Sequence, residues 1–117
     1  MKPDRYFSTQ NFDSTFRWAS PEILDVTGYN HEEIIGRNPY DFFHPDDLST
    51  IVRKHMNGVG LGDDNSIQKL TYRFRRKDNT FVWCQVLMVS YQGGLVCITR
   101  KLKWIEVIIW RLLMINP

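Results

Sequence analysis

The sequence has few cysteines, no long apolar run and no large excess of one charge. Cys84 and Cys97 are too few for a disulfide framework, and no CxxC or Cys/His spacing indicates a zinc site. The first ten residues lack the apolar stretch of a secretory signal, which predicts an intracellular location, cytoplasmic or nuclear. A formal charge of +2 is too small to indicate direct binding to nucleic acid or to an acidic membrane.

The most apolar stretch is WIEVIIWRLLMI at 104–115, which Glu106 and Arg111 interrupt. A helix of this length cannot cross a bilayer, which needs about 20 apolar residues, so we expect no membrane-spanning segment. The apolar residues do have the spacing of one helical face. They are Trp104, Ile108, Leu112 and Ile115.

The sequence also lacks a catalytic set, because no Ser/His/Asp or Cys/His group occurs at a recognisable spacing. The segment FFHPDD places His44 beside Asp46 and Asp47, which could indicate a metal site or a general base. Pro45, however, is typical of the first position of a helix, and carboxylates in a first turn are stabilised by unpaired N–H groups. We therefore expect FFHPDD to begin a helix, and the chain not to be an enzyme.

What the sequence does contain is a pattern of short helices between strands. Residues 5–8 and 15–19 read as a β-hairpin. Ser20-Pro21-Glu22 reads as the start of a short helix that ends at Gly28, and Asn30 with Glu33 resembles the capping box of a second one, closed by Gly36. Three later runs alternate like strands: SIQKLTYRFRR, FVWCQVLMVS and LVCITRK. The order predicts an α+β domain at 1–103, with one antiparallel sheet and helices on one face, followed by an apolar tail at 104–117.

The same order of signals resembles the PAS domain over about residues 5–101. The segments that carry the resemblance are TGYNHEEIIGRN, HPDD and YRFRRKDNTFVWCQV. The resemblance implies a five-stranded antiparallel sheet with helices over one face. It also implies a sensory or interaction module of a signalling or transcription-regulating system. One departure is KLK at 101–103, where many PAS domains have DIT, a motif linked to signal output.

The resemblance allows the flavin photosensor (LOV) branch of the family to be tested. In that branch the segment like GRNP reads GRNC, and its cysteine bonds to flavin; here the position is Pro39. Phe74, Cys84 and Thr99 fall where that branch carries flavin-bonding asparagines and a glutamine. We therefore expect no flavin photoadduct.

Haem would need an axial ligand on the long helix of the domain. His55 is the one candidate, but it precedes glycine in the last helical turn, where an exposed histidine is favoured by the helix dipole. Cys84 and Cys97 read as small buried residues. We expect no resident cofactor, with haem as the alternative.

The resemblance to the PAS domain implies which side chains of the later strands face the helices. These residues fill the core or line a pocket for a small apolar ligand, and a filled or small cavity is favoured. The pocket candidates are Tyr40, Phe42, Ile51, Tyr72, Phe74, Cys84, Met88 and Thr99, and the further core residues of these strands are Leu70, Val82, Val86 and Cys97.

The opposite face of the sheet is also apolar, which is unusual for a face in water. We expect it to be covered, either by the tail or by a partner subunit, in a homodimer or heterodimer with another PAS-containing chain. The predicted interface residues are Phe81, Trp83, Leu87, Val89, Trp104 and Ile108. The alternative function is a sensor that binds haem or a small molecule between helices and sheet.

Overall fold

The computed structural model describes residues 2–60 and 67–115, without the side chains of 55–60, 114 and 115. The strands are β1 (Arg5–Asn11), β2 (Phe16–Ala19), β3 (Ile67–Arg75), β4 (Phe81–Tyr91) and β5 (Gly94–Lys101). The helical segments are α1 (Ile23–Thr27), α2 (His31–Ile34), η1 (Pro39–Asp41), η2 (Pro45–Asp47), α3 (Leu48–Gly60) and α4 (Trp104–Ile115), where η marks a 3-10 helix.

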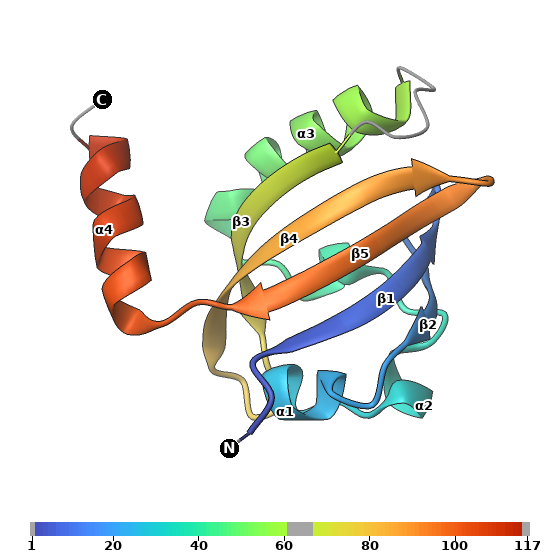
Figure 1. Cartoon of the computed structure of the whole chain (residues 1–117), viewed down its shortest axis with the longest axis horizontal. Helices are drawn as coiled ribbons and strands as arrows, with labels where there is room; N and C mark the ends of the chain where they lie inside the picture. Colours follow the sequence, from blue (N-terminus) through green and yellow to red (C-terminus); the bar gives the residue numbers. More distant parts are fainter. Residues whose placement is uncertain (1, 61–66, 116–117) are drawn as a thin grey trace.

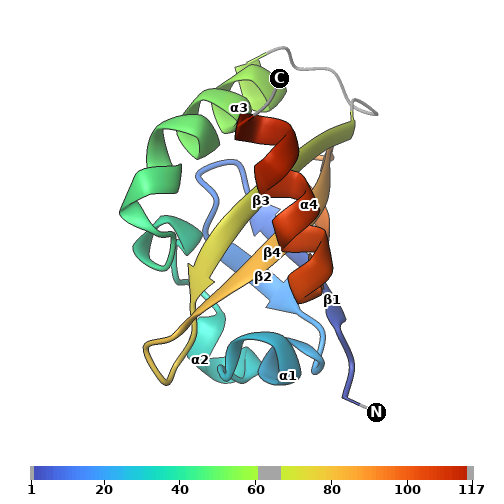
Figure 2. The same cartoon turned by 90° about the vertical axis from the view of Figure 1, so that its left-hand side faces the viewer.

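The strands form one antiparallel sheet in the order β2-β1-β5-β4-β3. Helices α1 to α3 lie on one side of the sheet, and α4 stands beyond the end where β5 finishes (Figures 1 and 2). The α+β class and the single face covered by short helices are thus confirmed. We call the surface away from α1 to α3 the outer face.

The first hairpin is present, but β1 extends three residues beyond the predicted 5–8. Thr9, Gln10 and Asn11 continue as strand because they pair with Val96, Leu95 and Gly94 of β5. A register shift after Thr9 disturbs the pairing with β2. The extension therefore comes from pairing with a strand that is distant in sequence, which local turn residues do not reveal.

The helix signals are right in two cases and wrong in one. Asn30 and Glu33 form the predicted capping box of α2, with each side chain accepting from the other residue's backbone N–H. Gly28 ends α1 with φ of +83°. Ser20, in contrast, does not cap α1, because its Oγ accepts a hydrogen bond from Phe7 N and α1 begins only at Ile23.

The helical layer bonds to part of each edge of the sheet. Along β3, Arg75 N donates to Phe42 O (2.7 Å) and His44 N donates to Arg73 O (3.0 Å). Along β2, Phe16 N donates to Arg37 O (2.9 Å) and Gly36 N donates to Phe16 O (2.8 Å). Backbone groups at an exposed edge would invite another strand to pair. Here the groups of Arg73, Arg75 and Phe16 are already bonded, which shortens the part of each edge that another strand could use.

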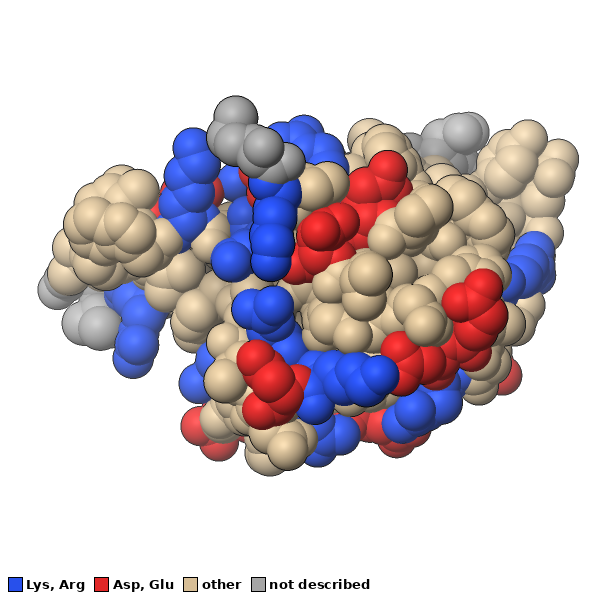
Figure 3. All heavy atoms as spheres, turned by 90° about the horizontal axis from the view of Figure 1, so that it is seen from below, with Lys and Arg blue, Asp and Glu red and all other residues tan. Residues whose placement is uncertain are grey.

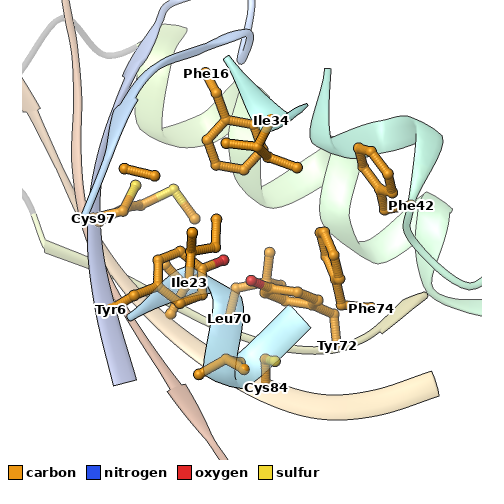
Figure 4. Packing of buried hydrophobic residues seen from close by; sticks show 14 of the residues in the cluster. Tyr6, Phe16, Ile23, Ile34, Phe42, Leu70, Tyr72, Phe74, Cys84 and Cys97 are labelled. Atoms are coloured by element: carbon orange, nitrogen blue, oxygen red, sulfur yellow. The ribbon is translucent and has the colours of Figure 1, made fainter. Parts of the chain in front are cut away.

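The core lies between the sheet and α1 to α3 (Figure 4). Phe42 stacks on Phe74 with 5.0 Å between ring centroids, and Phe43 meets Tyr72 edge-on at 4.8 Å. All the residues of the later strands predicted to face the helices are buried. They are Leu70, Tyr72, Phe74, Val82, Cys84, Val86, Met88, Cys97 and Thr99.

Candidate functional site: the outer sheet face

Cross-strand pairing gathers apolar side chains from all five strands on the outer face. In one row, Trp18, Thr9, Val96, Val89 and Ile67 lie opposite one another from β2 to β3. In the next row, Phe7, Ile98 and Leu87 are cross-strand neighbours. We call the apolar members of both rows the outer patch: Phe7, Trp18, Ile67, Leu87, Val89, Val96 and Ile98.

The outer patch is accessible to solvent. Phe7, Leu87 and Ile98 retain 49%, 42% and 38% of their exposure, and Ile67 retains 67%. Exposed single apolar residues are ordinary, but seven that neighbour one another on a sheet mark an interaction surface. Beyond the second row the surface becomes polar, because Arg5 lies opposite Arg100 and Arg100 opposite Gln85.

The four predicted interface residues of β4 divide into two groups. Leu87 and Val89 belong to the outer patch. Trp83 lies farther along β4, and its ring is partly covered by the Arg73 guanidinium, 4.9 Å from the ring centroid, and by Trp110 of α4 at 5.0 Å. Phe81 remains 44% exposed, with the His44 ring 4.8 Å away. The structure therefore moves the centre of the apolar surface from Trp83 toward β5 and β1.

Phe7, Val96 and Ile98 are members of the outer patch that the sequence analysis did not name. Val96 and Ile98 alternate with Cys97 and Thr99 in LVCITRK, and Phe7 lies between Tyr6 and Ser8 in RYFS. This alternation indicates that they face the side opposite to those neighbours. It does not indicate that β1, β5 and β4 are neighbours.

The tail forms α4, whose Ile109 and Leu113 line a hollow with Thr71 and Gln85, in the polar row beside the outer patch. Trp110 meets Trp83, and Glu106 accepts from Arg100 at 3.0 Å. Trp104 and Ile108, the two predicted interface residues of the tail, remain 73% and 45% exposed. The helix thus leaves the outer patch uncovered in this chain (Figure 1).

The FFHPDD segment has a structural role. His44 Nδ1 accepts a hydrogen bond from Asp46 N (3.0 Å) and caps η2. Asp47 accepts from Arg73 three times, from the backbone N–H and from Nε and an Nη of the side chain, at 2.8 to 3.1 Å. The side chains therefore point to different partners, and the described residues contain no cluster of three metal-ligating groups.

The contact with Arg73 favours the charged form of the Asp47 carboxyl. Burial alone would raise the pKa of its carboxyl, but the hydrogen bonds from the Arg73 side chain and backbone outweigh that effect and lower the pKa below its usual value. The Arg73 guanidinium joins η2 to the outer-face residue Trp83.

On the inner side, a cavity of about 40 Å³ lies between the sheet and the helical layer. Of the eight predicted pocket residues, six line it: Tyr40, Ile51, Tyr72, Phe74, Met88 and Thr99. Phe42 and Cys84 lie in the packed core instead. Residues from β1 and β2 that the sequence analysis did not name, Tyr6 and Phe16, also line the cavity.

The polar atoms of this cavity come from a buried cluster of hydroxyls. Tyr6 and Tyr72 point their hydroxyl groups toward each other (Figure 4). Both hydrogen-bond with Thr99. Burial raises the pKa of both tyrosines well above the usual value, because their charged forms would lose solvation. The cluster therefore stays neutral and can offer a small ligand hydroxyl donors and acceptors.

The cysteines are unsuited to covalent or metal chemistry at neutral pH. Burial raises the pKa of Cys84 to about 12, and it does the same for Cys97. Since the thiolate is the nucleophile and the metal ligand, both groups are held in the unreactive form. His55, the haem candidate, lies in α3, and its side chain is outside the described residues.

None of the helices in the described ranges is long and apolar enough to cross a membrane.

Comparison with known proteins supplies the family. Residues 16–99 match the PAS fold family. The aryl hydrocarbon receptor nuclear translocator homolog of Drosophila melanogaster is 31% identical over 86 residues, which are 74% of this chain and 13% of that protein. The human basic helix-loop-helix ARNT-like protein 2 is 28% identical over 105 residues, which are 90% of this chain and 16% of that protein. The chain thus spans less than a fifth of the length of either relative.

Solved structures agree with the fold at low sequence identity. The wild-type Drosophila melanogaster Cycle PAS-B domain with bound ethylene glycol has a TM-score of 0.67 and 22% identity, and the match covers 83% of this chain and 97% of that one. The PAS domain of an HTR-like protein from Haloarcula marismortui has a TM-score of 0.70 and 15% identity, with 84% and 86% covered. This chain belongs to the PAS fold family.

Proposed function

We propose that the chain is a non-catalytic PAS sensory and interaction module that dimerises through its outer sheet face. The observation that carries the proposal is the outer patch, a continuous apolar surface on the side of the sheet that no helix of the α1–α3 layer covers. Exposure of such a surface to water is unfavourable, and a partner subunit would remove the surface from water.

The partly bonded edges of the sheet support docking on the face. A partner that added a strand would need free backbone groups on β2 or β3. Those of Phe16, Arg73 and Arg75 already bond to the helical layer. Face-to-face contact needs no such groups and uses side chains that are already exposed.

The names of the relatives support the biological setting. One is named a homolog of the aryl hydrocarbon receptor nuclear translocator, and the other is named a basic helix-loop-helix protein. From these we infer an intracellular signalling or transcription-regulating system, in the cytoplasm or nucleus, with a second PAS-containing chain as partner. We propose no direct contact of this module with nucleic acid or membrane. Charges of both signs share the surface in Figure 3, and the formal charge is only +2.

The test is the oligomeric state of the whole chain in solution. Sedimentation equilibrium should show a dimer that Leu87→Glu shifts toward monomer, because burying a carboxylate in an apolar interface removes its hydration at a cost that Lys69, opposite on β3, only partly offsets. Leu24→Glu is the matched control, since Leu24 is 51% exposed on α1, on the other side of the sheet. If Leu87→Glu leaves self-association unchanged, and leaves binding to a PAS-containing partner unchanged, the outer face is not the interface.

A second function is carried by the inner cavity with its three hydroxyls. Its volume of about 40 Å³ suits only a few water molecules or a very small polar molecule, since one water needs about 10–15 Å³ by the same measure. Haem or flavin would need the core to open widely, so we propose that neither is resident. The absorbance spectrum of the purified protein tests this. A Soret band, or a lipophilic molecule released on denaturation, would support the ligand sensor instead.

A further inference from the structure

The helix α4 carries an apolar surface of its own. Trp104 and Leu113 are 73% and 66% exposed, and Ile105, Ile108 and Ile109 are between 44% and 51% exposed. Its two charged residues are Glu106, which pairs with Arg100, and Arg111. The helix appears at the left of Figure 3 as a largely uncharged body.

Several contacts hold the base of α4 in an orientation that leads it away from the outer patch. Leu102 N donates to Trp83 O (2.9 Å), and Lys103 N donates to Glu106 Oε1 (2.9 Å). Glu106 also accepts from Arg100, and Trp110 rests on Trp83. Only Lys103 separates buried Leu102 from the first helical residue.

This connection makes cover within one chain costly. To lie over Val96 and Ile98, α4 would have to swing about Lys103 from its position beside the end of β5 (Figure 1). That movement would break the Arg100–Glu106 pair and separate the Trp83 and Trp110 rings. A neighbouring molecule can receive α4 as it stands, with all of these contacts intact.

We propose that α4 of one copy packs on the outer patch of a second copy, and that a two-fold axis makes the exchange reciprocal. This inference rests on the proposed function, because it names the occupant of the outer face. The dimensions agree: twelve helical residues span about 18 Å, and a row crossing five strands spans about 19 Å.

A second copy fits better than an unrelated partner because each chain carries both surfaces. In a two-fold dimer each helix meets the other chain's patch, so the buried area is twice that of a single helix on a sheet. Stable interfaces bury about 1,200–2,000 Å² in total, which favours the doubled contact. The Trp104 and Ile108 side of α4 brings no acid into the patch, and the long side chain of Arg111 can extend to solvent.

Two variants of the full chain test the exchange. Ile98→Glu disrupts the patch and leaves α4 intact, while Ile108→Glu disrupts α4 and leaves the patch intact. Both residues are exposed, at 38% and 45%, so folding should persist, and circular dichroism checks it. Each variant alone should sediment as a monomer at concentrations where the unaltered chain is a dimer. Leu24→Glu should remain a dimer.

Mixing the two variants gives the decisive measurement. An equimolar mixture should form a heterodimer, because the intact helix of the Ile98→Glu chain can pack on the intact patch of the Ile108→Glu chain. One contact is recovered of two, so the heterodimer should dissociate at least tenfold more readily than the unaltered dimer. Should either variant fail to fold, Val96→Lys and Trp104→Lys form the second pair.

Other outcomes separate this inference from the proposed function. If Ile108→Glu remains a dimer while Ile98→Glu does not, the two sheet faces pack on each other; the exchange is overturned and the proposed function stands. If both variants keep the unaltered mass, both proposals fail. If the unaltered chain is a monomer and Ile108→Glu increases the reactivity of a cysteine placed at Val96, α4 covers its own sheet, and the exchange is again overturned.

Discussion

Asp47 and Asp46 are neighbours in the sequence with very different surroundings. The Asp47 side chain is 14% exposed and accepts three hydrogen bonds from Arg73, whereas the Asp46 side chain is 76% exposed. A buried donor that loses its acceptor costs more than a surface charge that is removed. The two carboxylates therefore offer a matched comparison within one turn.

We predict that Asp47→Ala lowers the free energy of unfolding by about 1–3 kcal/mol, because it leaves the Arg73 guanidinium and backbone N–H without their acceptor. Asp46→Ala should cost about 0.3–1 kcal/mol, the contribution of a charge near a helix start. Unfolding in urea measures both, since urea does not screen charges. Equal losses would show that the Asp47–Arg73 contact contributes nothing beyond helix electrostatics.

The same contact predicts a dependence on pH. Because the pKa of Asp47 is lowered in the folded chain, its contribution to stability is complete above the ordinary aspartate pKa of about 3.9 and declines as the pH falls through and below that value. The stability difference between the unaltered chain and Asp47→Asn should therefore shrink between about pH 5 and pH 2. A difference that stays constant over this range would contradict the assignment.

At the scale of elements, the turns that join helices and strands depend on backbone conformations open mainly to glycine. Gly28 at the end of α1 and Gly36 after α2 have φ of +83° and +81°. They differ in their surroundings. A Cβ on Gly28 would lie 3.2 Å from the Lys77 Cβ, whereas a Cβ on Gly36 would meet nothing within 4 Å.

We predict that Gly36→Ala costs about 1–2 kcal/mol, the conformational penalty of a left-handed residue with a side chain. Gly28→Ala should cost more, because α1 must also move away from the turn between β3 and β4. Thermal and urea unfolding of the pair measure the difference. A smaller loss at Gly28 than at Gly36 would mean that the Lys77 side of the contact yields freely.

Apart from Gly28, the β3–β4 turn meets the helical layer at two further points. Lys77 N donates to Thr27 O (3.0 Å), and Lys77 Nζ lies 2.6 Å from Glu33 Oε2. Glu33 also completes the capping box of α2. The end of α1, the start of α2 and the turn are thus joined through neighbouring contacts, which explains how such short helices keep a defined position.

At the scale of the whole molecule, α4 depends on the sheet more than the sheet depends on α4. Its described links are the Trp83–Trp110 ring contact and the pairing of Glu106 with Arg100 and Lys103 N. The buried core, by contrast, comes from the strands and from helical segments before α4. The division into a domain at 1–103 and a tail stays a prediction.

We predict that a chain ending at residue 103 folds as one cooperative unit. Its free energy of unfolding should fall by no more than about 1–2.5 kcal/mol, the sum of an aromatic pair and a partly exposed ion pair. Far-ultraviolet circular dichroism and urea unfolding measure this. Loss of the cooperative transition would show that α4 is part of the folding domain.

The sequence by itself determined the parts of this protein that depend on local pattern. Alternation along YRFRR and FVWCQVLMVS grouped the side chains by face, because side chains of a strand alternate with a period of two, and the resemblance to the PAS domain assigned Tyr72, Cys84 and Met88 to the core side. The capping box at Asn30 and the helix end at Gly28 were equally local. The order of these signals was enough to identify the PAS fold.

Only the tertiary structure decided which residues meet from distant parts of the chain. Strand order made neighbours of Phe7, Leu87 and Ile98, and it brought Asp47 to Arg73. Neither pairing follows from periodicity, which indicates the side a residue faces but not the strand beside it. The outer patch, the hydroxyl cluster and the position of α4 are therefore products of the fold, since each depends on register between strands that the chain connects only at a distance.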